Sequence, residues 1–276
     1  MSMLHCGRFR LDLAEPKIMA IINLTDDSFS GDGLRADTRA ALVRAEQALE
    51  EGADVLDIGA ESSRPGSDPV PEAQERERIV AFLQAAQAWR VPLSVDTLKP
   101  VVMCAALDAG ADMINDINGF RAPGAVEAVA GGEAGLCLMH MQGEPRTMQQ
   151  DPRYEDVVGE VAGFFAERVA VLVAAGVGRE RLVLDPGLGF GKNTSHNYTL
   201  LRDLGRLAVG GLPLLAGLSR KSMLGAVTGR PVEDRLAASV AGALIAVQNG
   251  AGIVRVHDVA ATRDALRVWK ATQNPC

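Results

Sequence analysis

Three acidic or amide side chains follow short apolar runs, at positions where they could bind one small molecule. Asp96 follows LSV, Asn115 lies in MINDINGF, and Asp185 lies in LVLDPGLGFGK. Any one of them could simply cap the next helix. Carboxylates accept paired N–H bonds, whereas an asparagine amide both donates and accepts. If the three runs converge, this set suits a flat heterocycle that carries amino, ring N–H and carbonyl groups on one edge.

Basic residues follow the last two apolar runs. Ser219, Arg220 and Lys221 stand together in AGLSRKSMLG, and Arg255 and His257 are spaced two apart in RVHD. Period-two spacing directs both side chains to the same side of a strand. A single basic residue there could be structural, but a cluster favours anion binding. The planar guanidinium of an arginine can also stack on a ring.

The apolar runs that position these residues alternate with helical patterns along the whole chain. Buried parallel strands that alternate with helices and carry polar residues at one rim are typical of a (β/α)8 barrel, or TIM barrel. Thr38, Pro71 and Pro100 are the expected signals for helix starts. The strands are expected at 17–22, 54–58, 91–95, 111–114, 135–139, 181–184, 212–218 and 251–256. The helices are expected at 37–51, 72–89, 99–109, 122–131, 155–176, 194–204, 233–249 and 259–272.

Length and composition exclude several classes of protein. The 276 residues match one barrel, and we interpret 1–276 as a single domain because no linker or low-complexity tract divides them. The net charge of −7, with both signs interspersed, gives no broad basic field for nucleic acid. We expect no membrane partner and a cytoplasmic location, because no signal core or membrane-spanning run is visible. The four cysteines lack C-x-x-C spacing, so neither zinc nor a disulfide is expected.

Three connecting or terminal segments stand out. Residues 4–13 show a weak alternation around a glycine, which predicts a short N-terminal hairpin that closes the bottom of the barrel. Segments 23–36 and 59–71 are long and rich in Gly, Ser, Asp and Pro. Long polar loops at the carboxyl rim of a barrel are typical of lids or substrate clamps.

Two further features are ambiguous. His140, in LMHMQGEPRTM, could line the rim or be held by neighbouring loops, and we assign it no catalytic role. Gly187, Gly189 and Gly191 form G-x-G-x-G, which has neither the phosphate-loop spacing nor the dinucleotide-binding pattern. These glycines are expected to let the backbone pass close to a bound substrate.

The ordered motifs resemble those of the dihydropteroate synthase family of folate biosynthesis. They are NLTDDSFSGDG, DIGAESSRPGS, SVDT, INDINGF, MHMQGEPRTM, DPGLGFGK, LSRKSMLG and RVHD, and they span nearly the whole chain in the family's order. The resemblance implies a (β/α)8 barrel that condenses 6-hydroxymethyl-7,8-dihydropterin pyrophosphate with 4-aminobenzoate. The products would be 7,8-dihydropteroate and pyrophosphate. It also implies a homodimer.

The resemblance assigns roles to individual positions of this sequence. Asp96, Asn115 and Asp185 correspond to ligands of the pterin edge, with Lys221 also at the pterin and Arg255 stacking on it. Asn23 corresponds to the residue that helps hold Mg2+ on the pyrophosphate. Four positions match contacts to substrate or the leaving anion: Ser63, Arg64, Arg255 and His257. Four others fall where the family shapes the aminobenzoate pocket: Phe29, Pro65, Phe190 and Ser219. Catalytic roles are implied for Arg64, Lys221, Arg255 and His257.

Two motifs depart from the family pattern. SSRPG replaces the common STRPG, so Ser63 keeps the hydroxyl and loses a methyl group. In the first loop Asp26 replaces a proline and the late acid is displaced to Asp32, which leaves Asp27 and Asp32 as alternative loop acids.

The implied reaction favours an SN1-like course, in which pyrophosphate departs before the arylamine attacks. Mg2+ and the basic residues would stabilise the departing anion. One alternative is a pterin-binding methyltransferase barrel with a corrinoid partner, but SSRPG and SRKSMLG favour anion and aminobenzoate binding. Another is a non-catalytic pterin-binding protein. Loss of the basic pair or of Asn23 would indicate that alternative, and both are present.

Overall fold

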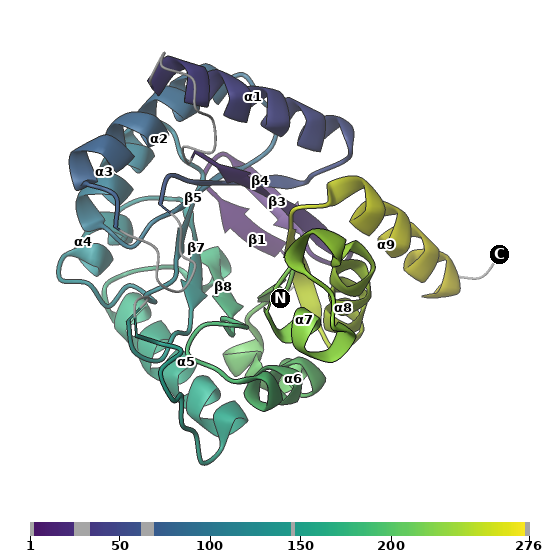
Figure 1. Cartoon of the computed structure of the whole chain (residues 1–276). Helices are drawn as coiled ribbons and strands as arrows, with labels where there is room; N and C mark the ends of the chain where they lie inside the picture. Colours follow the sequence, from purple (N-terminus) through teal and green to yellow (C-terminus); the bar gives the residue numbers. More distant parts are fainter. Residues whose placement is uncertain (1–2, 25–33, 62–68, 145–146, 274–276) are drawn as a thin grey trace.

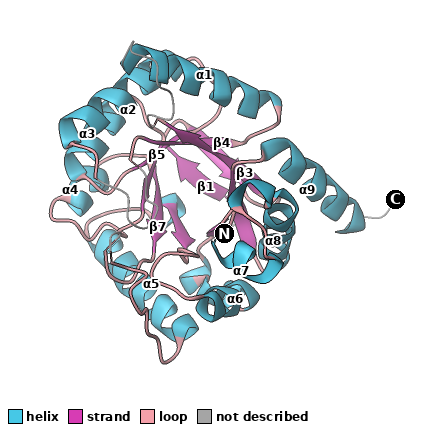
Figure 2. Ribbon diagram, viewed as in Figure 1, coloured by secondary structure: helices cyan, strands magenta, loops and turns pink. Residues whose placement is uncertain are grey.

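A computed structural model describes residues 3–24, 34–61, 69–144 and 147–273 of the chain. Eight parallel strands form a closed barrel in the order β10-β3-β4-β5-β6-β7-β8-β9. Helices surround this barrel on the outside, and Figures 1 and 2 show the ring that they form. The predicted (β/α)8 barrel is therefore confirmed. The strands are β3 Lys17–Asn23, β4 Val55–Gly59, β5 Leu93–Asp96, β6 Met113–Asp116, β7 Gly135–Met139, β8 Leu182–Asp185, β9 Leu214–Gly217 and β10 Ala251–Val256.

The alternation of side chains along each strand divides the core into two parts. Outward-facing aliphatic residues of the strands pack against the helices, and Phe82 and Phe165 are fully buried in this outer layer. Inward-facing apolar residues form a separate layer inside the barrel. Its members are Met19, Val55, Met113, Cys137, Val183, Leu215 and Ile253.

The predicted N-terminal hairpin is confirmed and closes the barrel beneath this inner layer. β1 (Met3–Cys6) pairs antiparallel with β2 (Phe9–Asp12), and Leu4 and Cys6 are buried against the inner apolar residues. Arg8 fastens the hairpin to the barrel by donating to both carboxylate oxygens of Asp112, at 2.9 and 2.8 Å. Because the lower end is filled with side chains, the upper end, formed by the carboxyl ends of the strands, is left for chemistry.

The helices follow the predicted alternation, with some shifted boundaries. They are α1 Leu34–Glu50, α2 Glu72–Ala86, α3 Pro100–Asp108, α4 Ala125–Ala130, α5 Val157–Ala174, α6 Thr194–Arg202, α7 Ser222–Thr228, α8 Leu236–Gln248 and α9 Val259–Gln273. Pro71 is the N-cap of α2 and Pro100 is the first residue of α3, as expected. The prediction for Thr38 is wrong, because α1 begins at Leu34 and Thr38 lies inside it.

Among the α-helices of the described residues, α7 was not predicted. α7 follows β9 and has only seven residues, SMLGAVT, so its apolar periodicity covers less than two turns. Gly225 in its middle further weakens the helical signal.

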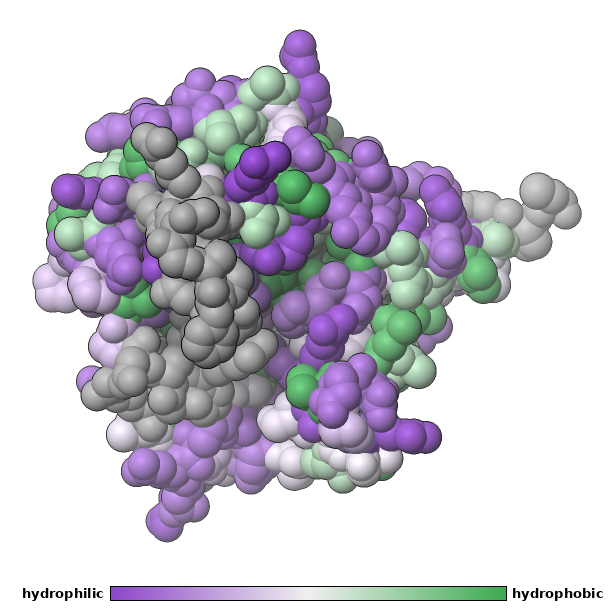
Figure 3. All heavy atoms as spheres, turned by 45° about the horizontal axis from the view of Figure 1, so that its top comes forward, coloured by the Kyte–Doolittle hydropathy of each residue, from purple (hydrophilic) through white to green (hydrophobic). Residues whose placement is uncertain are grey.

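Two expectations concern cysteines and membranes. Cys6, Cys104 and Cys137 carry free thiols, while Cys276 lies outside the described residues. Among the described helices, none has the length and apolar character needed to cross a lipid bilayer. On the face drawn in Figure 3, hydrophilic residues predominate and hydrophobic ones are scattered among them.

Candidate active site

Polar side chains from five strands meet above the inner apolar layer. They are Asp57 on β4, Asp96 on β5, Asn115 on β6, Asp185 on β8 and Arg255 on β10. Together with Lys221, these residues are called the floor of the site. Parallel register sets neighbouring strand ends level with one another, and Asp96 stands directly opposite Asn115. The convergence expected from the sequence is therefore present in the structure.

Arg255 joins two of these strand ends through its guanidinium. Its Nε donates to Oδ2 of Asp57 at 2.6 Å, and a terminal nitrogen donates to Oδ2 of Asp96 at 2.8 Å. Burial alone would lower the pKa of Arg255, but the carboxylates of Asp57 and Asp96 outweigh it and raise that pKa. Arg255 is thus held as a cation at the centre of the floor.

Asn115 is held from one side. Its Nδ2 donates to Oδ2 of Asp57 at 3.1 Å. Its Oδ1 is buried and accepts no hydrogen bond from any residue that the structure describes. A buried polar atom without a partner is costly, so this oxygen is a candidate acceptor for a bound ligand.

Asp185 and Lys221 form the other side of the floor. Oδ1 of Asp185 accepts from the N–H of Gly187 at 2.7 Å, and Nζ of Lys221 donates to the carbonyl oxygen of Leu188 at 2.8 Å. Nζ of Lys221 also lies 4.6 Å from the ring centre of Phe190, a cation–π contact. Burial raises the pKa of the Asp185 carboxyl and lowers that of Lys221 to about 8. The predicted aminobenzoate residue Phe190 therefore lies beside the predicted pterin lysine.

A cavity of about 550 Å³ lies between α1 and the start of α9, and two of the remaining predicted residues, Asn23 and His257, line it. Oγ of Ser219 lies 2.9 Å from Nδ1 of His257 and joins β9 to β10. Arg44 also lines the cavity and donates to the carbonyl oxygen of Asn23 at 2.8 Å. The predicted metal ligand Asn23 and the predicted anion contact His257 therefore line one cavity, and Ser219, predicted for the aminobenzoate pocket, contacts His257.

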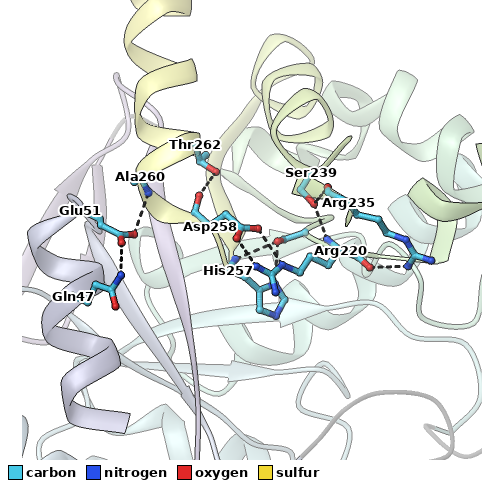
Figure 4. A network of polar contacts seen from close by, with 10 residues as sticks. Gln47, Glu51, Arg220, Arg235, Ser239, His257, Asp258, Ala260 and Thr262 are labelled. Carbon is cyan, nitrogen blue, oxygen red and sulfur yellow. Dashed lines mark hydrogen bonds and ion pairs between the residues drawn. The ribbon is translucent and has the colours of Figure 1, made fainter. Parts of the chain in front are cut away.

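Arg220 differs from its neighbours in the SRK motif. It adopts a left-handed conformation with φ of 61°, which is uncommon for a residue other than glycine. Its guanidinium pairs with Asp258 at 2.5 and 3.1 Å, and its backbone N–H donates to Ser239. Figure 4 shows this pair beside His257. The motif therefore divides, with Lys221 in the pterin floor and Arg220 at the cavity.

The donor set at Asn23 fits the expected magnesium ion. Mg2+ keeps several waters and is usually bound through one or two protein oxygens together with substrate phosphates. Asn23 lines the cavity, and its amide oxygen is a donor of this chemical type. This chemistry fits a metal that arrives with its phosphate substrate.

Several predicted residues lie outside the described part of the chain. They are Asp26, Asp27, Phe29, Asp32, Ser63, Arg64 and Pro65. Their roles stay predictions.

His140 is held by neighbouring loops, which was the second of its two sequence interpretations. Its Nδ1 lies 2.9 Å from Nζ of Lys192, and burial lowers the pKa of its ring to about 2.

The interpretation of the glycines needs a correction. A Cβ on Gly187 would meet the carbonyl oxygen of His140 and one on Gly191 that of Gln142, so at these positions the close approach is to a neighbouring loop.

Sequence reasoning assigned no role to three polar residues around the site, although Asp57 was among the polar residues expected at the strand ends. Asp57 joins Asn115 to Arg255, and Lys192 lies beneath the loop after β8. Lys99 bridges Glu61 and Glu75 at 2.6 Å each. Asp57 had a usable signal, because it is the charged residue inside the apolar run DVLDI. Lys99 and Lys192 carry no comparable signal, since lysines in loops are usually exposed.

A closed parallel barrel with carboxylate, amide and cationic groups at its carboxyl rim defines an α/β-barrel protein built to bind a polar heterocycle. Residues 19–257 match the family model described as pterin binding enzyme. The chain belongs to this family, and within it to the dihydropteroate synthases.

Named relatives and solved structures support this assignment over nearly the full length. The chain is 50% identical over 275 residues to the dihydropteroate synthase of Haemophilus influenzae, covering 98% of this chain and 99% of the relative. The Burkholderia cenocepacia enzyme, solved with 7,8-dihydropteroate, is 53% identical with a TM-score of 0.91, covering 99% of this chain and 96% of that one. The Xanthomonas albilineans enzyme, solved with 4-aminobenzoic acid, is 48% identical with a TM-score of 0.93, covering 100% and 99%.

Proposed function

We propose that this chain joins 6-hydroxymethyl-7,8-dihydropterin pyrophosphate to 4-aminobenzoate, releasing pyrophosphate and 7,8-dihydropteroate. The observation that carries the proposal is the convergence of acceptors from Asp96, Asn115 and Asp185 with the cations Lys221 and Arg255. This set matches a pterin edge group by group. Relatives solved with 7,8-dihydropteroate and 4-aminobenzoic acid support the same substrates.

The proposed course is an SN1-like substitution. The C–O bond breaks first, and pyrophosphate leaves with the electron pair from a CH2 group attached to the electron-rich dihydropterin. The floor residues hold the ring of the resulting cation, while Arg255, His257 and Arg64 stabilise the departing anion. The amine nitrogen of 4-aminobenzoate then forms the new C–N bond and loses a proton. Positioning both partners in one site removes much of the entropic barrier.

The proposed cofactor is Mg2+ bound with the pyrophosphate, and Asn23 would be its ligand from this chain. When bound, the ion neutralises charge on the leaving phosphates. His257 and Arg44 line the same cavity as Asn23, so their side chains would bind and orient that anion there.

We also propose a homodimer and a cytoplasmic location. Exposed apolar side chains near α7 and α8, namely Val227, Val232, Leu236 and Ile245, support a protein partner on this side. The free thiols of Cys6, Cys104 and Cys137 suit a reducing compartment. Light scattering after gel filtration tests the dimer, and cell fractionation tests the location.

The activity is tested by turnover of the two substrates with and without Mg2+, following pyrophosphate and dihydropteroate separately. We expect both products in equal amounts, and loss of both in Asp185→Ala. Binding of a pterin without formation of either product would instead support the non-catalytic alternative. Methyl transfer from a methylated pterin would support the methyltransferase alternative.

A further inference from the structure

Asp57 lies within strand β4 and is one of the polar residues that meet above the inner apolar layer. Its side chain is fully buried. The same carboxylate oxygen, Oδ2, accepts from Nε of Arg255 at 2.6 Å and from Nδ2 of Asn115 at 3.1 Å. Asp57 therefore contacts two floor residues through Oδ2, while its Oδ1 is buried and accepts no hydrogen bond from the described residues.

These contacts fix which end of the Asn115 amide faces the site. An ionised carboxylate only accepts hydrogen bonds. In an asparagine amide, Nδ2 donates and Oδ1 accepts, and the two atoms point in different directions from the same carbon. Turning the amide over would place Oδ1 of Asn115 against Oδ2 of Asp57, two acceptors in contact. Asn115 therefore keeps Nδ2 on Asp57, and its buried Oδ1 accepts no hydrogen bond from the described residues.

The fixed orientation changes the chemistry of the floor. With Oδ1 of Asn115 turned away from Asp57, positions 96, 115 and 185 all offer acceptors to a ligand, while Lys221 offers a donor. We propose that Asp57 is a positioning residue that fixes the amide of Asn115, and that the floor thereby selects heterocycles with an edge rich in N–H donors. This inference deepens the proposed function and rests on it.

The experiment compares two ligands on the same protein. Pterin carries an amino donor at C2, whereas pteridine-2,4-dione carries a carbonyl acceptor there. The ratio of their two dissociation constants is independent of the folded fraction, because misfolded protein lowers the binding capacity for both alike. A purely structural role of Asp57 would leave the ratio unchanged.

Asp57→Leu removes the acceptor at similar size, so the Asn115 amide is free to turn. We expect the preference for pterin to fall by about tenfold or more, since a site that no longer holds its acceptor toward the donor groups of the ligand loses its discrimination. Asp57→Asn is the conservative variant. Nε of Arg255 can only donate, so it holds the oxygen of the new amide in place, and we expect the preference to stay within about threefold of the native value.

Ser94→Ala is the matched control. Ser94 lies opposite Asp57 in the barrel register, is equally buried, and makes no hydrogen bond to a described residue. We expect its preference to equal that of the native chain. Asp57→Ser, whose shorter side chain does not reach Asn115, replaces Asp57→Leu if the leucine variant does not accumulate as folded protein.

An unchanged ligand ratio in Asp57→Leu or Asp57→Ser, or a collapsed ratio in Asp57→Asn, overturns the inference alone if the native chain binds pterin. Failure of the native chain to bind pterin at all overturns the proposed function and this inference together.

Discussion

Lys192 and His140 meet in the interior with Nζ of the lysine 2.9 Å from Nδ1 of the imidazole. Burial lowers the pKa of Lys192 to about 7 and that of His140 to about 2, so the neutral ring accepts from the ammonium. Lys192 also donates to the carbonyl oxygens of Gly187 and Phe190, at 3.1 and 2.8 Å. This one side chain therefore fastens the loop that follows Asp185 to the end of β7.

Lys192→Met should lower the free energy of unfolding. The substitution keeps the aliphatic stem but leaves buried carbonyl oxygens without a donor, and we expect a loss of about 3 kcal/mol. Urea denaturation followed by circular dichroism measures it. Lys270→Met is the control, because Lys270 pairs with Glu15 on the surface, where ion pairs contribute about 1 kcal/mol or less. Equal effects of the two substitutions would contradict this assignment.

Most of the barrel could be predicted because each strand is buried on both faces and reads as an apolar run. The runs at 135–139 and 251–256 coincide with β7 and β10 at both ends. The start of α1 could not be predicted, because Leu34–Asp37 follow a Gly- and Asp-rich segment with no apolar periodicity.

The candidate site shows the same division. Asp96, Asn115, Asp185 and Arg255 could be found from their position at strand ends. The partnership between Asp57 and Arg255 could not, because it joins residues 198 positions apart and depends on closure of the barrel. Sequence spacing gives the direction of a side chain along its own strand but not the partner that it meets across the barrel.

Asp185→Ala should weaken binding of a pterin analogue by about 1–3 kcal/mol, the cost of leaving a buried N–H group of the ligand without an acceptor. Titration calorimetry on protein shown to be folded by circular dichroism measures this. Unchanged affinity would remove Asp185 from the pterin site.

The affinity for a pterin analogue should pass through a maximum with pH. Burial raises the pKa of Asp96 to about 7, so its carboxylate accepts ligand N–H groups best above that pH. Burial lowers the pKa of Lys221 to about 8, so its ammonium donates best below that pH. Affinity should therefore rise as pH increases through 7 and fall as pH increases beyond 8.

The two limbs of this profile can be assigned with an analogue that keeps one protonation state across the range. Asp96→Asn should flatten the acid limb, and Lys221→Met should flatten the alkaline one. A native profile without either limb would show that these groups do not titrate on binding.

Removal of Mg2+ with a chelator should abolish turnover and leave pterin-analogue affinity unchanged, because the proposed ion contacts only the pyrophosphate. Asn23→Ala should raise the Mg2+ concentration needed for half-maximal turnover. Asn249→Ala is a suitable control, since Asn249 bonds to the carbonyl oxygen of Leu201 away from the rim. Loss of analogue affinity on chelation would place the metal at the ring instead.

Pyrophosphate should be released in the absence of 4-aminobenzoate if ionisation precedes attack. The acceptor groups of the floor would stabilise the ring cation once the C–O bond has broken, while the cationic Arg255 would stabilise the departing pyrophosphate, so cleavage does not require the amine. Rapid-quench samples with the pyrophosphate substrate and Mg2+ should show about one pyrophosphate per site, because without the amine the positioned pterinylmethyl group does not leave the site as product. His257→Ala should slow this release, because the departing anion loses a partner, whereas the exposed-pair variant Lys270→Met should release it at the native rate. A strict requirement for 4-aminobenzoate before any C–O cleavage would establish direct displacement instead.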